Sequence, residues 1–458
     1  MIDDLFAHIE ANRDDRIARL ADFLRVPSVS TDPAYKGHID DAARFTADWL
    51  ERLGMNAQVL PTEGHPCVVG DDDDAPDGAP HVLFYGHYDV QPPDPLELWT
   101  TPPFEPTIRD GAIYARGASD DKGQVACFLE ALAAWREARG KLPIKLTVMI
   151  EGEEECGSVG LEPFIERHRD RFAADVAVVS DTSFWEGGVP AITYGLRGLL
   201  YFDVKLHGPS RDLHSGVYGG TVANPLNEMA KVLGRLFDDD HRVTIPGFYD
   251  KVTGPTDAER AAWDALGFDE TRWAASVGLD RPFGQAGIST LERRWSQPSC
   301  DINGLYGGYM AEGAKTVIPS FAGAKVSFRL APDQEPEAVA EAFETWLENR
   351  TPPGCRWAVR RFGSALPVVI DTDSPHLAAA RRAMAAGCGR DPVLVREGAT
   401  IPVVASFKNQ LGVDTLLMGF GRHDDAIHSP NEKFELTHFD MGCRSHAALI
   451  AELAGSGA

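Results

Sequence analysis

The feature that most constrains the fold is a strand-like apolar run that stops abruptly in a cluster of carboxylates. Residues 144–150 read IKLTVMI, and their apolar and β-branched side chains alternate as they do in a buried strand. Four glutamates follow within five positions: Glu151, Glu153, Glu154 and Glu155. Ligands bind beyond the carboxyl ends of strands in open α/β sheets, so the cluster is a candidate functional site. Taken alone, it is explained at least as well by a helix N-terminus, where acidic side chains face the positive end of the helix dipole.

Three other segments repeat the pattern of an apolar strand followed by acidic or histidine side chains. They are residues 81–90, which carry His87 and Asp89, residues 111–121, which end in Asp120 and Asp121, and residues 176–183, which carry Asp181. Helical spacing predicts one helix over residues 2–24 and another over residues 124–139. Because strands alternate with helices, we predict an α/β fold with a doubly wound, largely parallel sheet.

A change of pattern at about Tyr194 predicts a second domain. Residues 199–208 and 324–332 alternate as half-exposed strands do, and residues 224–237 and 336–349 have helical spacing. The α/β character returns after Pro367. We therefore predict a first domain made of residues 1–193 and 367–458, interrupted by an inserted α+β domain at residues 194–366.

Composition indicates a soluble globular enzyme. The chain has 458 residues, of which 43 % are hydrophobic and 25 % are charged. Its net charge of −25 argues against nucleic acids and anionic membranes as partners, and no apolar run approaches the length of a membrane span. The N-terminus is acidic and amphipathic, unlike a signal peptide. Seven cysteines without CxxC spacing favour reduced thiols, so we expect a cytoplasmic location.

Ligand-type side chains follow five predicted segments, and together they indicate a metal centre. They are His87, Asp120, Glu154 with Glu155, Asp181 and His428. Each one alone is better explained as a loop hydrogen-bonding group or a helix cap. Two imidazoles and three or four carboxylates at one edge of one sheet are what a pair of divalent cations requires, with one carboxylate bridging them. The sequence has no HExxH, GxSxG or P-loop motif that would favour a different chemistry.

Nine short motifs, taken in order, resemble those of the M20 family of metallopeptidases, and in particular its cytosolic non-specific dipeptidase and carnosinase branch. The motifs are GHYDV, RGASDDKG, EGEEECGS, VVSDT, RDLHSGVYGG, KTVIP, SFRLAP, REGATIPV and DDAIHSPNEK. The resemblance covers nearly the whole chain. It implies a homodimeric, dinuclear metal-dependent dipeptidase, with an α/β catalytic domain and an inserted domain that serves as lid and dimerisation element.

The resemblance also implies a role for each residue of the metal centre. His87 and Asp181 would ligate one metal ion, Glu155 and His428 would ligate the other, and Asp120 would bridge the two. Asp89 would hold the imidazole of His87 in orientation, as ligating histidines require. Glu154 would act as the general base. The peptide bond between Asp120 and Asp121 would be cis.

Further residues are implied for substrate recognition. His214 would come from the partner subunit and stabilise the oxyanion, although a lid that closes over its own site would deliver it in cis. Arg329 would bind the substrate carboxylate through paired hydrogen bonds, while Thr316, Gly398 and Thr400 would contact the substrate. Without the resemblance, His214 is an ordinary loop residue and Arg329 an ordinary charge on the surface of a strand.

Two departures from the family pattern bear on substrate preference. Relatives in this branch carry Gly-Ser where this chain has Ala399-Thr400, and they have an uncharged residue at the position of Glu153. Neither departure removes a ligand. We expect two divalent ions per subunit, zinc first, with manganese or cobalt as alternatives, because histidine and carboxylate ligands suit all three.

Three functions are compatible with this sequence. The favoured function is hydrolysis of dipeptides. An N-acyl-amino-acid deacylase or a carboxypeptidase of the same family would use the same metals and the same attacking water. A catalytically silent binding protein on the same scaffold is the non-enzymatic alternative, but it would have no need of the general base Glu154.

Overall fold

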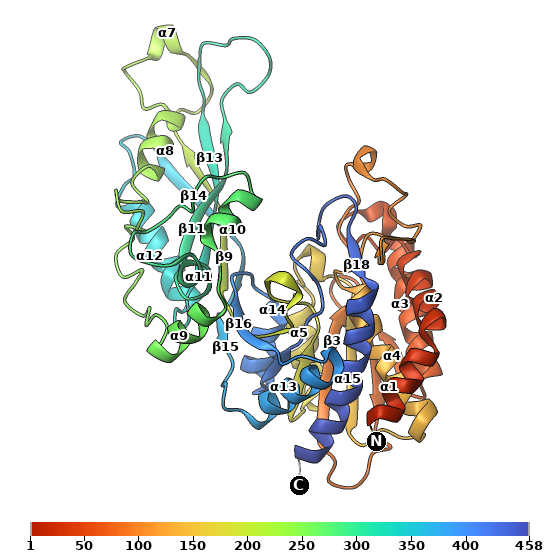
Figure 1. Cartoon of the computed structure of the whole chain (residues 1–458). Helices are drawn as coiled ribbons and strands as arrows, with labels where there is room; N and C mark the ends of the chain where they lie inside the picture. The colour runs from red at the N-terminus through yellow and green to blue at the C-terminus, as the bar shows by residue number, and fades with distance from the viewer. Residues whose placement is uncertain (1, 457–458) are drawn as a thin grey trace. The chain divides into compact units, whose positions relative to one another are not determined.

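The computed structural model describes residues 2–456, and the chain divides into two compact units (Figure 1). The first unit comprises Met1–Tyr194, Ile370–Val395 and Ser406–Ala458, and the second comprises Gly195–Val369 and Arg396–Ala405. The sequence analysis divides the chain after residues 193 and 366. It does not anticipate that residues 396–405 belong with the inserted segment.

The first unit is built on the larger part of a nine-stranded sheet with a parallel centre. Four neighbouring strands run parallel in the order β6 (Lys145–Glu151), β3 (His81–His87), β7 (Val176–Val179) and β17 (Thr415–Leu417). Antiparallel strands flank them: β1 (Asn56–Leu60) and β2 (Cys67–Asp72) beside β6, and β8 (Ala191–Leu196) and β15 (Val368–Val369) beyond β17. Strand β16 (Val393–Glu397) also pairs with β8. The predicted α/β class with a largely parallel central sheet is confirmed.

Helices pack on this sheet around one large apolar core. The longer ones are α1 (Ile2–Ala11), α2 (Arg13–Leu24), α3 (Lys36–Arg52), α4 (Lys122–Arg139), α13 (Pro375–Cys388) and α15 (Leu436–Ser456); shorter ones are α5 (Leu161–Arg167) and α6 (Arg169–Phe172). The short helix α14 (Pro402–Ser406) belongs to the second unit except for its last residue. The single helix predicted over residues 2–24 is wrong, because α1 and α2 are separate. The amide of Asn12 donates to the main-chain oxygen of His8 (2.9 Å), and this competition with helical hydrogen bonds accompanies the break.

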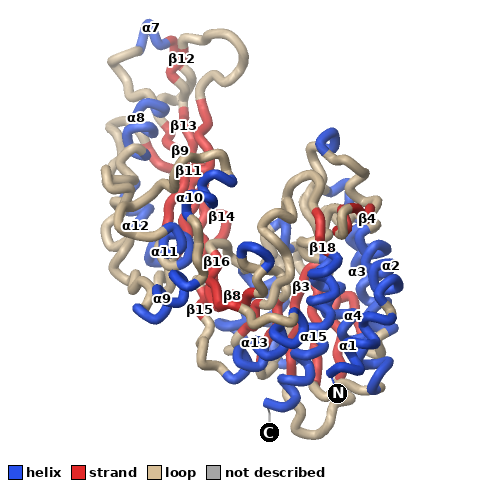
Figure 2. The backbone as a smooth tube through the Cα atoms, in the orientation of Figure 1, coloured by secondary structure: helices blue, strands red, loops and turns tan. Residues whose placement is uncertain are grey.

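A small three-stranded sheet lies apart from the large one (Figure 2). It has the order β18 (Lys433–Glu435), β5 (Ala112–Tyr114) and β4 (Thr107–Arg109). The strand predicted within residues 111–121 therefore does not belong to the central sheet, which corrects the prediction. Both neighbours of β5, which are β4 and β18, belong to the small sheet. Its pairing with β18 instead brings the segment before Asp120 beside the segment after His428.

The second unit contains a four-stranded antiparallel sheet with helices packed against it (Figure 2). Its strand order is β11 (Ser299–Gly307), β13 (Phe321–Leu330), β9 (Gly198–His207) and β14 (Arg356–Ala365). Every second residue of β9 is buried, as its alternating pattern predicts. The buried side chains of β9 and β13 pack on α8 (Pro225–Leu233) and α12 (Pro336–Glu348). Helices α9 (Asp257–Ala265), α10 (Glu270–Ser276) and α11 (Thr290–Trp295) belong to the same unit.

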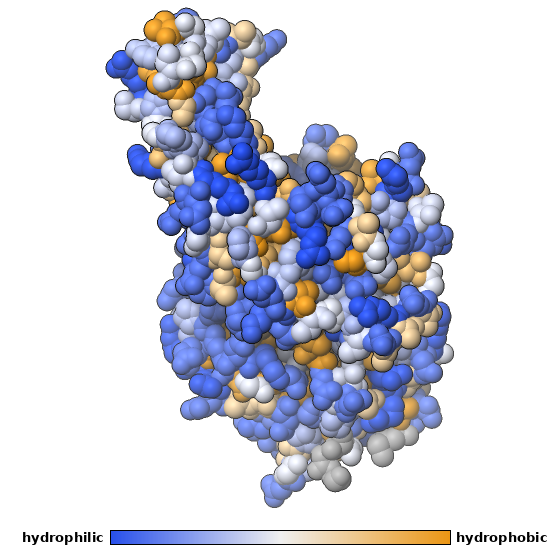
Figure 3. All heavy atoms as spheres, turned by 90° about the vertical axis from the view of Figure 1, so that its left-hand side faces the viewer, coloured by the Kyte–Doolittle hydropathy of each residue, from blue (hydrophilic) through white to orange (hydrophobic). Residues whose placement is uncertain are grey.

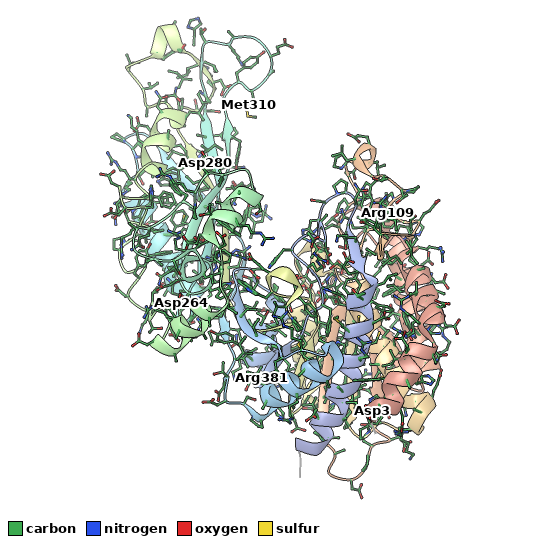
Figure 4. The ribbon with its side chains drawn as sticks, in the orientation of Figure 1. Asp3, Arg109, Asp264, Asp280, Met310 and Arg381 are labelled. Atoms are coloured by element: carbon green, nitrogen blue, oxygen red, sulfur yellow. The ribbon has the colours of Figure 1, made fainter. Side chains whose placement is uncertain are left out.

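A separate two-stranded ladder in the second unit joins β10 (Leu213–His214) to β12 (Val317–Ile318), next to the short helix α7 (Ser215–Tyr218). Large apolar side chains are exposed around it, on α7, on the segment that follows α7 and on the loop that follows β11: Val217, Tyr218, Val222, Tyr309 and Met310. Figure 4 labels Met310 on that loop, and Figure 3 shows hydrophobic residues at the tip that carries α7. Within residues 2–456, no helix is long and apolar enough to cross a membrane.

Candidate metal centre

Two groups of ligand-type side chains in the first unit share the carboxylate of Asp120. The first group is His87, Asp120 and Asp181, and the second is Asp120, Glu155 and His428; in each, the ligand atoms lie within 4.8 Å of one another. The Nε2 atom of His87 is 3.1 Å from Oδ1 of Asp120, and Nε2 of His428 is 3.0 Å from Oδ2. Asp120 therefore presents one oxygen to each group.

The parallel strands explain why these side chains converge. His87 is the last residue of β3, Glu155 lies on a 3₁₀ turn (Glu154–Cys156) after β6, and Asp181 follows β7. His428 lies on the loop after β17. The carboxyl ends of parallel strands meet at one edge of the sheet, where α/β proteins commonly bind ligands. Asp120 is the exception, because it precedes α4 and follows the small sheet.

The loop that carries Asp120 is held by a buried carboxylate that the sequence analysis missed. Glu432 accepts hydrogen bonds from the main-chain nitrogens of Gly117 (2.9 Å), Ser119 (2.9 Å) and Asp120 (3.1 Å), and from the guanidinium of Arg116 (2.7 Å). Since Glu432 follows His428 by four residues, it ties the two loops together. The only sequence signal for it is its place in the motif DDAIHSPNEK, which also contains His428.

The peptide bond between Asp120 and Asp121 is cis, as the family resemblance implies. Asp121 occupies the N-cap position of α4, but its side chain makes no capping hydrogen bond. It accepts instead from the main-chain nitrogen of His87 (3.2 Å). The alternative that Asp120 and Asp121 are simple helix caps is therefore wrong for Asp121.

Asp89 orients groups on both sides of the centre. Its two carboxylate oxygens accept from the main-chain nitrogens of Glu154 (3.2 Å) and Glu155 (3.0 Å). Its main-chain oxygen lies 3.1 Å from Nδ1 of His87, and its Oδ1 lies 3.4 Å from the same atom. If Nδ1 carries the proton, Nε2 is left with a lone pair directed at Asp120, the state that a metal ligand needs.

The hydrogen bonding of the buried Nε2 atom of His87 shows whether these residues suit a metal ion. Among the described residues it has no hydrogen-bond partner of acceptable geometry. A buried imidazole nitrogen without a partner is costly unless something binds it. A divalent cation would satisfy His87 and the surrounding carboxylates at once, so the donor set fits the two-metal prediction.

The electrostatics of the cluster also favour bound cations. Burial raises the pKa of Asp181 to about 7, and the neighbouring charge of Asp120 adds to this rise. Burial likewise raises the pKa of Glu154 well above its ordinary value, against the opposing effect of His87. Hydrogen bonds to Asp120 and Glu155 raise the pKa of His428 to about 10. The site thus holds more negative charge than its own imidazoles neutralise, and cations would relieve the repulsion.

The carboxylate of Glu153 makes its hydrogen bonds outside the two ligand groups. Its carboxylate is buried and accepts from the main-chain nitrogens of His65 (3.0 Å) and Gly160 (2.5 Å). These bonds hold the loop after β6 against the loop before β2. The position at which the sequence departs from the family pattern therefore carries a bracing group, while Glu154 and Glu155 remain beside the candidate ligands.

The remaining candidate residues lie in the second unit, in two places. His214 and Thr316 lie at the ladder of β10 and β12, where the main-chain nitrogen of Ser215 donates to the oxygen of Thr316 (3.1 Å). Arg329 on β13 donates to the hydroxyl of Thr400 (2.8 Å), and Gly398 belongs to the same turn as Thr400.

Comparisons with known proteins match the chain over nearly its whole length. The model of peptidase family M20/M25/M40 matches residues 83–452. The Cys-Gly metallodipeptidase of Schizosaccharomyces pombe is 33% identical over 472 residues, which cover 99% of this chain and 98% of that protein. The human Beta-Ala-His dipeptidase is 32% identical and covers 99% and 93% respectively. A solved M20 metallo-carboxypeptidase from Sulfolobus solfataricus superposes with a TM-score of 0.86 at 31% identity, covering 96% of this chain and 99% of that one.

Proposed function

Since the chain belongs to peptidase family M20/M25/M40 and is a metal-dependent hydrolase, we propose that it is a dinuclear metallodipeptidase that cleaves the peptide bond of dipeptides. The observation that carries the proposal is the pair of ligand groups that share Asp120. One carboxylate between two sets of imidazole and carboxylate ligands suits two closely spaced cations better than one. The named dipeptidases among the relatives supply the substrate class.

In this proposal His87 and Asp181 would hold one cation, Glu155 and His428 would hold the other, and Asp120 would be shared by both. Zinc is the expected ion, with manganese or cobalt as alternatives. When bound, the cations lower the pKa of the attacking water and polarise the scissile carbonyl. Asp89 keeps the ring of His87 and the turn of Glu154 and Glu155 in place through the contacts described above.

Glu154 is proposed as the general base. Its carboxylate removes a proton from water as the water oxygen adds to the carbonyl carbon of the substrate. The same proton then passes to the nitrogen of the departing amine as the C–N bond breaks, so that one dipeptide and one water give two amino acids. Burial raises the pKa of Glu154 toward the range in which a carboxyl group both accepts and donates a proton.

His214 is proposed to donate a hydrogen bond to the oxyanion that forms on the carbonyl oxygen. The main-chain nitrogen of Gly216 donates to Nδ1 of His214 (3.0 Å), so in the neutral ring the proton sits on Nε2. His214 is exposed, which leaves this Nε2 proton free to reach a ligand. We propose that it acts in the partner subunit of a homodimer, and the exposed apolar side chains around α7 support an interface there.

Arg329 is proposed to bind the carboxylate of the substrate, and Thr316, Gly398 and Thr400 are proposed as further substrate-recognition residues. A carboxypeptidase is the second candidate function, favoured by the M20 metallo-carboxypeptidase among the solved relatives. Both activities require a free C-terminal carboxylate, so Arg329 does not separate them. The two activities are separated by the length of the peptide that the enzyme accepts.

A substrate screen with defined metals tests the proposal. Purified protein is stripped of metal, reconstituted separately with Zn²⁺, Mn²⁺ and Co²⁺, and assayed on dipeptides, tripeptides and N-acyl-amino acids. The dipeptidase assignment predicts turnover of dipeptides well above that of the other two classes. A preference for longer peptides would select the carboxypeptidase instead.

The two-metal assignment has its own test. Metal analysis should find two ions per subunit in the parent protein and clearly fewer in Asp120→Ala, which lacks the shared carboxylate. Retention of two tightly bound ions in Asp120→Ala would refute the bridging role.

A cytoplasmic location is also proposed. All seven cysteines lie in the described part of the chain, and none of them is paired in a disulfide. Fractionation of the native cells and blotting of each fraction would test this location directly.

A further inference from the structure

A chain of contacts in the second unit links Arg197, Thr400 and Arg329. The hydroxyl of Thr400 donates to the main-chain oxygen of Arg197 (2.6 Å) and accepts from Nη1 of Arg329 (2.8 Å). A hydroxyl has one proton to donate. In this arrangement the proton of the hydroxyl is directed at Arg197, and its oxygen accepts from Arg329. The hydroxyl of Thr400 therefore helps to fix the position of the guanidinium of Arg329.

The side chain of Arg197 fixes the turn from which Thr400 projects. Its Nε donates to the main-chain oxygen of Gly398 (3.0 Å), and its Nη1 lies 3.3 Å from the main-chain oxygen of Gln297 and 3.4 Å from the hydroxyl of Ser299. The packing is tight at Gly398, where an added Cβ would lie 3.0 Å from Nη2 of Arg197. The turn is therefore clamped between the guanidinium and the strands of the second unit.

This place holds two guanidinium groups, with Glu397 and Asp301 as the acidic residues whose charges act on them. Arg197 and Arg329 lie close enough that burial, and then the charge of Arg329, lower the pKa of Arg197 to about 10. Burial also lowers the pKa of Arg329. Two partly buried guanidinium groups repel each other, so a carboxylate bound there would gain from both.

We infer that Arg197 and Thr400 are positioning residues that hold Arg329 in the orientation needed for the free carboxylate of the substrate, and that they thereby set the preference for substrates with a free C-terminus. The inference rests on the proposed function, since it assumes that Arg329 meets that carboxylate. It changes the role of Thr400, which the family resemblance describes as a substrate contact. Threonine also has a more restricted χ1 than the serine of the relatives, so it makes a stiffer support.

Ligand binding tests the inference without depending on turnover. Zinc-loaded Glu154→Gln protein serves as the parent, and calorimetry gives the Kd of a dipeptide and of the same dipeptide with an amidated C-terminus. The ratio of the two Kd values measures the preference for the free carboxylate. In this parent, Thr400→Val removes the hydroxyl at nearly constant volume, Thr400→Ser retains it, and Arg197→Gln removes the clamp.

We expect Thr400→Val and Arg197→Gln each to reduce the ratio by about tenfold, the usual scale for a hydrogen bond to a charged group, by weakening the dipeptide and leaving the amide unchanged. Thr400→Ser should stay within about twofold of the parent. An unchanged ratio in Thr400→Val, equal weakening of both ligands, or a parent that does not prefer the carboxylate would each overturn the inference. Failure of the proposed function shows separately, as absence of dipeptide turnover by the wild-type protein.

Discussion

The two units of this protein bury different kinds of side chain. The large core of the first unit surrounds many buried ionisable groups, among them Arg16, Arg116, Lys122, Glu130, Glu151, Glu432 and His446. The core of the second unit is apolar and is formed by residues such as Leu200, Phe202, Val326, Phe343 and Trp346. Among its described residues, the buried polar side chains are Thr290, Ser296, Gln334 and Arg396.

This difference separates two tasks. A buried charge is costly unless hydrogen bonds or ion pairs compensate it, and the first unit supplies such partners around its candidate ligands, as at Asp89 and Glu432. The second unit keeps its candidate residues His214 and Thr316 exposed and Arg329 half-buried. We read the first unit as a preorganised chemical site and the second as a recognition surface on an ordinary apolar scaffold.

The largest expected effect separates Glu154 from its neighbour. Glu154→Gln keeps the shape of the side chain and all proposed ligands, so metal content should be unchanged while kcat falls by roughly 10²- to 10⁴-fold. The matched control is Glu153→Gln, which disturbs the bracing bonds to His65 and Gly160 but leaves the base intact. It should lower thermal stability and retain most of kcat. Near-normal kcat in Glu154→Gln would remove the base from the mechanism.

The next effect concerns acid stability and the buried ionisable groups of the first unit. Burial lowers the pKa of His446 to about 3, and its Nε2 lies 2.7 Å from the hydroxyl of Ser180. Below pH 6.5 the unfolded chain binds a proton at this residue and the folded chain does not, so stability falls as the pH falls. From pH 6.5 to pH 4.5 the loss is about 2.3 kcal/mol, roughly fiftyfold in the unfolding constant.

Replacement of His446 should remove this part of the acid sensitivity. In urea denaturation, His446→Gln should lose about 2.3 kcal/mol less than wild type between the two pH values. Val326→Ala in the second unit is the control, because deletion of apolar volume should cost the same at both pH values. If both variants lose the same stability between the two pH values, burial of His446 does not contribute to the acid sensitivity of the first unit.

How far the sequence predicts this molecule depends on where each signal lies in the chain. His87 ends its strand, and Asp181 and Glu155 lie two and four residues beyond theirs, so local pattern alone places them at one sheet edge. The bracing contact from Asp120 to Glu432 spans 312 residues, and the contact from Thr400 to Arg197 spans 203. Such pairings are set by tertiary packing and leave no trace in local periodicity. The three-residue strand β5 gives too little pattern to show which sheet it joins.

The third effect tests whether a buried carboxylate serves the metal centre or only stability. Glu432→Gln replaces one acceptor oxygen by a donor facing the main-chain nitrogens around Asp120, so the bridging carboxylate should lose its orientation. We expect zinc affinity to fall by roughly 10- to 100-fold, the usual scale for a group that orients a ligand. Glu130→Gln is the matched control, since Glu130 is buried in the same unit and pairs with Arg19. Its affinity for zinc, measured by chelator competition, should equal that of wild type.

The smallest expected effect asks whose active site the second unit serves. His214 is exposed at the tip of the second unit, and the proposed base and ligands all belong to the first. If His214 acts in the partner subunit, inactive His214→Ala and Glu154→Gln proteins should complement each other in mixed dimers. In each mixed dimer one site combines an intact Glu154 with an intact His214, and the other site has neither. Random exchange makes about half of the dimers mixed, and half of their sites are intact, so roughly a quarter of wild-type activity should return.

Subunit exchange is verified by mass spectrometry of differently tagged subunits. Full exchange without recovered activity would assign His214 to its own subunit or remove it from catalysis, and the recognition surface would then act within a single chain.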